Sequence, residues 1–260
     1  MFRVMAVLAA VVVAAAPAFA AGRGKEITFK SGDEEVTGYL ATPEGKGPFP
    51  AIVVIQDFYG LSEWVKDNAD RLAGKGYVAL APDLYRGKAA ANPMQAMQLM
   101  RGMPRDRALR DLKGAAEALA GRKDVDKERL GCIGWCMGGG YSLQLALHDP
   151  HIKACAMCYG QVVTNAEQLK PLKAELLGVF AEQDRGIPPE AVHKFEEALK
   201  EAGKKVYKIE EFPAGHGFMR PASPDGKPSP AYNADAAKRA WQDVDRFFAA
   251  TLQGEERKEK

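Results

Sequence analysis

Residues 134–138 restrict what this chain can fold into more than any other stretch, because they place Cys136 between two glycines. A short, mostly apolar stretch at residues 129–133 comes before them, and residues 141–148 have the pattern of a helix. Strand, sharp turn and helix with a nucleophilic side chain at the apex form a nucleophile elbow, and the glycines leave room for its strained turn. Such a pentapeptide also occurs as a loop beside a buried cysteine, but its position between a strand and a glycine-led helix favours the elbow.

The first twenty residues have the features of a secretory signal peptide. Arg3 supplies a positive charge, residues 4–16 are apolar but too short to span a bilayer, and small residues precede a cleavage site after Ala20. An N-terminal membrane anchor is the alternative. We therefore expect an exported protein, periplasmic or secreted, with residues 21–260 forming one domain.

Segments with strand and helix patterns alternate along the rest of the chain. Short apolar or alternating runs predict strands at 25–29, 35–41, 51–55, 77–80, 129–133, 153–159, 176–181 and 206–212. Helical periodicity predicts helices at 62–75, with Ser62 as its cap, and at 93–101, 106–119, 141–148, 190–202 and 233–252. This alternation is typical of an α/β fold with a mostly parallel central sheet and helices on both faces. The helix at 93–101 carries a methionine stripe, which predicts either core packing or a pliable pocket wall.

Four reactive side chains follow predicted strands and should gather at the carboxyl edge of the sheet, where ligands bind in such folds. They are Asp57, Cys136, Asp184 and His216. Nucleophile, acid and histidine in this chain order form a catalytic triad in which the acid orients the histidine and the histidine activates the thiol. We expect the oxyanion of the reaction to be held by the backbone N–H groups of Met137 and Phe58.

The other three cysteines leave a redox function open. Cys155 and Cys158 have C-x-x-C spacing, but they lie in a predicted strand, where residues three apart face opposite sides. A redox pair of this kind instead opens a helix. We expect buried thiols here, and a bridge from Cys132 to one of the pair remains possible if their strands are neighbours.

The chain resembles the dienelactone hydrolase family, the carboxymethylenebutenolidases, whose fold is a single-domain α/β-hydrolase. Almost the whole mature chain carries the resemblance, at residues 54–60, 76–85, 134–139, 184–188, 215–218 and 232–241. Cysteine at the elbow is a specific mark of that family, and its triad corresponds to Cys136, Asp184 and His216.

The resemblance implies further roles. Family members have a glutamate that pairs with the resting thiol, and this chain has the shorter Asp57 at that position. Arginines hold the substrate carboxylate in the family, which implies substrate-binding roles for Arg220 and Arg86, with Tyr85 beside them. The implied reaction opens a lactone or ester through a thioester on Cys136, with no metal or organic cofactor.

Three functions follow in order of preference: a dienelactone-like hydrolase, a general exported carboxylesterase or thioesterase, and a thiol redox protein using Cys155 and Cys158. A formal net charge of +2 gives no reason to expect nucleic acid or a membrane as partner. We expect a monomer acting on a small ester or lactone, with an anionic group if the arginines bind it.

Overall fold

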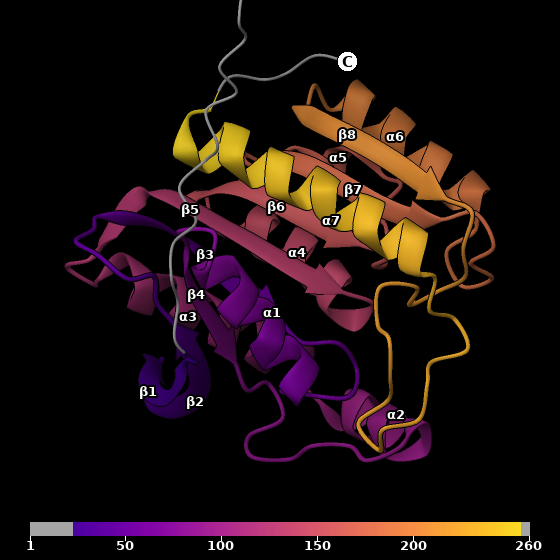
Figure 1. Cartoon of the computed structure of the whole chain (residues 1–260). Coiled ribbons are helices and arrows are strands. Elements are labelled where there is room, and N and C mark those ends of the chain that lie inside the picture. Colours follow the sequence, from indigo (N-terminus) through magenta and orange to yellow (C-terminus); the bar gives the residue numbers. More distant parts are fainter. Residues whose placement is uncertain (1–22, 256–260) are drawn as a thin grey trace, which may run out of the picture.

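A central eight-stranded sheet organises the computed structural model, which describes residues 23–255 (Figure 1). Its strands are β1 (Lys25–Ser31), β2 (Glu34–Ala41), β3 (Phe49–Ile55), β4 (Val78–Pro82), β5 (Val125–Trp135), β6 (Ile152–Cys158), β7 (Glu175–Ala181) and β8 (Val206–Phe212). They are ordered β1-β2-β4-β3-β5-β6-β7-β8. β1 and β2 form the expected antiparallel hairpin at one edge, and the strands from β4 to β8 are parallel. The predicted α/β fold with a mostly parallel sheet is confirmed.

Helices cover both faces of this sheet. They are α1 (Glu63–Ala73), α2 (Pro93–Gly102), α3 (Arg105–Ala120), α4 (Met137–His148), α5 (Ala166–Leu169), α6 (Pro189–Glu201), α7 (Ala234–Phe248) and the π-helical turn η1 (Ala249–Gln253). One buried cluster joins α3, α4, α5 and α6 to the sheet, and a second joins α1 and α7 to the opposite face. Figure 1 shows α1 and the yellow α7 on the near side, with α3 and α4 behind.

The helix boundaries differ from the expected ones where tertiary contacts decide them. Ser62 stands at the N-terminus of α1 but its side chain makes no capping bond, because its hydroxyl oxygen accepts weak bonds from Arg220. α4 begins at Met137 rather than at residue 141, so that the glycines after the elbow are already helical. The short α5 had no clear periodicity in the sequence. The predicted signal peptide lies outside the described residues.

The cysteines on β5 and β6 are free and buried. Cys155 packs in the cluster beneath α3 and α4, whereas Cys158 packs in the cluster beneath α1 and α7, so the two thiols face opposite sides as predicted. Cys132 is directly opposite Cys155 on the neighbouring strand. Burial raises the pKa of Cys132 and of Cys158, which makes both poor nucleophiles.

All three tryptophans belong to one aromatic cluster on the α1–α7 face. The ring centroid of Trp135 lies 4.9 Å from that of Trp64 and 5.8 Å from that of Trp241. Guanidinium groups close both ends of this row, with Arg71 4.3 Å from Trp241 and Arg220 4.9 Å from Trp64. The residue before Cys136 is thereby fixed between two helices.

The topology fixes where ligands meet the sheet. After β3 the chain crosses to β4 on one side, and it later returns to β5 on the other side of β3. The loops after β3 and β5 therefore diverge and leave a crevice at their carboxyl ends.

Candidate active site

The elbow after β5 has the strained geometry that its glycines predict. Cys136 has φ 55° and ψ −116°, a conformation that non-glycine residues rarely adopt. A Cβ on Gly134 would lie 2.2 Å from the carbonyl oxygen of Gly138, and a Cβ on Gly138 would lie 2.4 Å from that of Gln56. Neither position accommodates a side chain, so these glycines are needed for the backbone to turn here.

The structure brings Cys136, His216 and Asp184 together. Nε2 of His216 lies 3.0 Å from Sγ of Cys136, and Nδ1 of the same ring lies 2.6 Å from Oδ2 of Asp184. The second carboxylate oxygen of Asp184 accepts the backbone N–H groups of Gly186 and Ile187, which fixes the carboxylate in place. The three side chains come from the ends of β5, β7 and β8, as the sequence predicts.

The surroundings of His216 favour the imidazolium form. Partial desolvation lowers the pKa of the ring, but hydrogen bonds and charge interactions with Cys136 and Asp184 outweigh it and raise the pKa of His216 to about 9. Tyr159 packs edge-on against the ring with the centroids 5.4 Å apart. A protonated imidazole at 3.0 Å stabilises a neighbouring thiolate, which is the nucleophilic form of cysteine.

The loop after β3 lies against the N-terminus of α4, and several contacts hold it. Oδ1 of Asp57 accepts the N–H of Tyr59, and the hydroxyl of Tyr85 donates to the carbonyl of Phe58 at 3.0 Å. The N–H groups of Phe58 and Met137 make no hydrogen bond within the described part of the chain. Both expected oxyanion donors are therefore free. Tyr85 is buried and is not among the residues that line the cleft, and its hydroxyl holds this loop through the Phe58 carbonyl.

Asp57 contacts Arg220 and not Cys136. Nη1 of Arg220 lies 2.6 Å from Oδ2 of Asp57, and both side chains are less than a tenth exposed. The guanidinium also donates to the carbonyl of Ala222 and lies between Tyr59 and Trp64 at 4.7 and 4.9 Å from their ring centroids. Burial raises the pKa of Asp57, and Arg220 opposes that shift. The structure thus pairs Asp57 with Arg220 instead of with the thiol, and the buried Arg220 is not among the residues that line the cleft.

Arg86 does not reach the site either. Its guanidinium bonds both carboxylate oxygens of the fully buried Asp111 at 2.8 and 3.0 Å, and it also pairs with Glu34. Asp111 is shielded from water, so its buried negative charge needs the guanidinium of Arg86 as a partner. The structure therefore places Arg86 outside the cleft lining, paired with these two carboxylates, and does not bring it to Cys136 as the resemblance implied.

A cleft of about 820 Å³ opens above Cys136 and His216. Its wall runs from the elbow along α4 to the corner between α2 and α3, and the lining also includes Gln161, Val163 and Ile187. Met100 lines it, whereas Met94 is 73% exposed and lies outside it, so the predicted stripe is a pocket wall at one end only. Arg101 and Arg105 also reach this lining, and no pattern in the sequence indicated it.

Comparison with known proteins decides the family. The profile described as "Dienelactone hydrolase family" matches residues 36–252. The chain belongs to this family. A Methylorubrum extorquens protein named "Putative carboxymethylenebutenolidase" is 32% identical over 237 residues, which covers 86% of this chain and 79% of the relative. An Escherichia coli K12 protein of the same name is 32% identical over 230 residues, covering 83% and 82%.

A solved structure agrees with this assignment. The "Putative Dienelactone Hydrolase" of Klebsiella pneumoniae superposes with a TM-score of 0.77 at 29% identity, covering 87% of this chain and 98% of that one. The chain is accordingly a hydrolase of the dienelactone hydrolase type.

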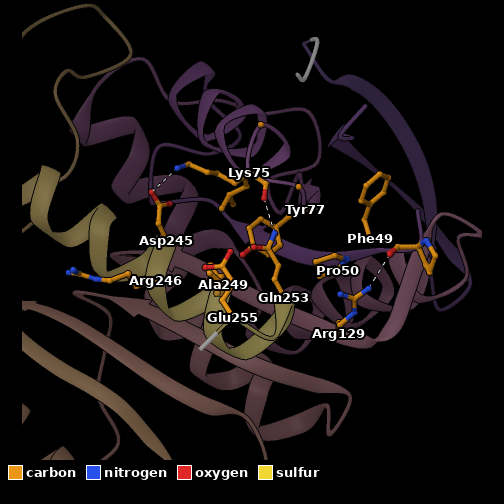
Figure 2. Close-up of a pocket in the computed structure, with 15 residues that line it drawn as sticks. Phe49, Pro50, Lys75, Tyr77, Arg129, Asp245, Arg246, Ala249, Gln253 and Glu255 are labelled. Atoms are coloured by element: carbon orange, nitrogen blue, oxygen red, sulfur yellow. Dashed lines mark hydrogen bonds and ion pairs between the residues drawn. The ribbon is translucent and has the colours of Figure 1, made fainter. Parts of the chain in front are cut away.

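The protein has a second hollow, which lies at the amino ends of the parallel strands, opposite the cleft at their carboxyl ends (Figure 2). It measures about 600 Å³ and includes Phe49 and Tyr77, which lie at or just before the amino ends of β3 and β4. Figure 2 shows the side chain of Lys75 in an ion pair with Asp245, and the side-chain amide of Gln253 donating a hydrogen bond to the backbone carbonyl of Lys75. It contains no cysteine or histidine. Residues 23–255 contain no group of three His, Cys, Asp or Glu side chains suited to a metal, and none of their helices is long and apolar enough to cross a membrane.

Proposed function

We propose that this protein hydrolyses a lactone or carboxylic ester through a Cys136–His216–Asp184 triad and a thioester intermediate. The observation that carries the proposal is the pair of contacts on His216, 3.0 Å to the sulfur and 2.6 Å to the carboxylate. This is the arrangement in which a base activates a nucleophile while an acid fixes the base.

In the first half of the reaction, Nε2 of His216 holds the thiol proton and the sulfur of Cys136 attacks the carbonyl carbon. The negative charge on the carbonyl oxygen is stabilised by the free N–H groups of Met137 and Phe58. The carbon–oxygen bond of the ester then breaks. His216 gives its proton to the departing alkoxide, and an acyl group remains on the sulfur.

In the second half, His216 removes a proton from water as the water attacks the thioester carbon. The tetrahedral intermediate uses the same two N–H groups. When the carbon–sulfur bond breaks, the carboxylic acid leaves and the proton on His216 restores the resting pair with Cys136. Asp184 keeps the ring orientation through both halves.

In this proposal no acidic side chain has to move away from the thiol before the thioester forms on Cys136. Asp57 is bound to Arg220 and the sulfur already faces His216. For this reason we assign Asp57 and Arg220 to holding the Phe58 loop. An anionic substrate would meet Arg101 and Arg105 instead, since both line the cleft and neither forms an ion pair with a described residue.

The alternatives rest on weaker support. A general carboxylesterase or thioesterase would use the same groups, and activity on neutral p-nitrophenyl esters with none on dienelactone would select it. A redox function of Cys155 and Cys158 is disfavoured because the thiols are buried on opposite faces of the sheet. We further propose export directed by residues 1–20, a monomeric state and no nucleic-acid or membrane partner.

The test combines labelling with turnover. Iodoacetamide at pH 7 should modify Cys136 first, as mapped by peptide mass spectrometry, and esterase activity should be lost in proportion. Cys136→Ala should abolish ester hydrolysis while keeping the wild-type circular dichroism. Retained hydrolysis in this variant would place the chemistry elsewhere, and preferential labelling of Cys155 or Cys158 would favour the redox alternative.

A further inference from the structure

The cleft wall beyond the nucleophile carries a methionine-rich apolar strip, which runs beside the charged side chains of Arg101, Arg105 and Asp106. Met100 and Met103 come from α2 and the turn that follows it, and Met137 from the start of α4. Leu109, Val163 and Ile187 complete the apolar part of the lining. Methionine side chains adapt to ligands of different shape, and they form pliable binding surfaces elsewhere.

This wall continues onto the surface of α2. The exposed large hydrophobic residues of the described chain are Met94, Met97 and Tyr232, and two of these three lie on α2. Met97 is 37% exposed and precedes Met100 by one helical turn. Only Ala96 of this helix is buried, so core packing does not account for its methionines.

The sheet order decides which part of an ester can reach this wall. The leaving group must lie beside His216, which donates its proton, and His216 and Asp184 follow β8 and β7 on one side of β5. α3 packs on β1, β3, β4 and β5, and the α2–α3 corner is therefore on the other side of the nucleophile. A carbonyl group at Cys136 then directs its acyl chain toward Met100 and its leaving group toward His216.

We propose, on the basis of the function assigned above, that the natural substrates are esters with an extended apolar acyl chain, which lies along the wall formed by Met100, Met103, Met137 and Leu109. The volume of about 820 Å³ is in the range of pockets that enclose drug-sized ligands. The acyl chain of the substrate lies in an open-ended cleft, because the row of methionines continues along α2 to Met97. A small monocyclic lactone would leave most of this wall without contact.

The first experiment measures acyl-chain length. The p-nitrophenyl esters of acetate, butyrate, hexanoate and octanoate should show rising kcat/KM, by about fourfold for each methylene that becomes fully buried. Ethyl octanoate and octyl acetate are isomers that carry the long chain on opposite sides of the ester. Ethyl octanoate should be hydrolysed faster, because its chain is on the acyl side.

The second experiment compares one substitution at two positions of α2. Met100→Gln should lower the octanoate-to-acetate ratio of kcat/KM about tenfold, because a polar amide replaces part of the apolar wall. Met94→Gln is the matched control outside the cleft and should leave both activities within twofold of the wild type.

Three results would overturn the proposal: a flat chain-length profile, equal or faster hydrolysis of octyl acetate, or equal effects at Met94 and Met100. If Cys136-dependent acetate hydrolysis persists alongside any of these, the proposed function stands and only the acyl-chain assignment fails. Absence of ester hydrolysis, or its persistence in Cys136→Ala, would overturn both.

Discussion

Replacing Arg220 by methionine tests whether the buried pair with Asp57 supports the fold or binds a substrate. The variant leaves the Asp57 carboxylate, which is 4% exposed, without the cation that lies 2.6 Å away. Breaking a buried ion pair in this way costs about 3–5 kcal/mol. In a chain of this size each kcal/mol lowers Tm by about 2–4 °C, so we expect a loss of about 10 °C.

The loss should depend on pH in a defined direction. Burial raises the pKa of Asp57 above 3.8, and without Arg220 its strongest opposing interaction is gone. A carboxyl with a raised pKa in the folded state favours folding when protonated, and this advantage disappears as the pH rises. The difference between variant and wild type should therefore be small near pH 4 and largest at neutral pH.

Thermal and urea unfolding followed by circular dichroism measure this effect. Arg239→Met is the matched control, because its ion pair with Glu210 is exposed and should contribute less than about 1 kcal/mol. The double variant Asp57→Asn with Arg220→Met should recover part of the loss. An Arg220→Met protein that melts with the wild type but has a tenfold higher KM for anionic esters would refute this reasoning and restore the substrate-binding role.

Three further predictions concern the site. In the folded protein the pKa of His216 is raised to about 9 from an ordinary 6.5, so its contribution to stability is complete below about pH 6.5 and is lost as the pH rises through 9. The difference in unfolding free energy between the wild type and His216→Gln, measured by urea unfolding, should therefore shrink over that interval. A difference that stays constant with pH would contradict this prediction. Tyr85→Phe removes the bond that holds Phe58 and should lower kcat about tenfold at similar KM, whereas Tyr39→Phe, which loses a hydroxyl bond far from the cleft, should not. Arg105→Gln should reduce kcat/KM for a monoester with a terminal carboxylate about fivefold relative to its neutral methyl ester, with the salt dependence weakened in parallel, and an unchanged ratio would exclude this residue from anion binding.

The positions of the reactive groups were predictable because they depend only on where the parallel strands end. Buried apolar runs identify the strands, and the carboxyl ends of parallel strands meet at one edge. Cys136 and Asp184 each follow such a run, and His216 follows the half-buried edge strand β8. The elbow was equally predictable from the sequence, because Gly134 and Gly138 occupy positions where no Cβ fits.

The partners of the charged side chains were not predictable, because they are chosen across long distances in sequence. Asp57 and Arg220 are 163 residues apart, and neither has a local pattern that indicates the other. Arg86 is drawn to Asp111 because that carboxylate is fully buried, a fact that depends on how α3 packs on β1. The cleft wall is a similar case, since it forms only where the α2–α3 corner meets α4.

The row of tryptophans gives this protein an optical reporter at a single place. Because Trp64, Trp135 and Trp241 share one cluster, all the indole emission of the chain comes from the region beside Cys136 and beneath Arg220. A red shift of that emission at a denaturant concentration where the helical signal is still intact would show that this corner opens before the rest of the sheet. Fluorescence and circular dichroism would then report two different events, and a folding study of this chain needs both.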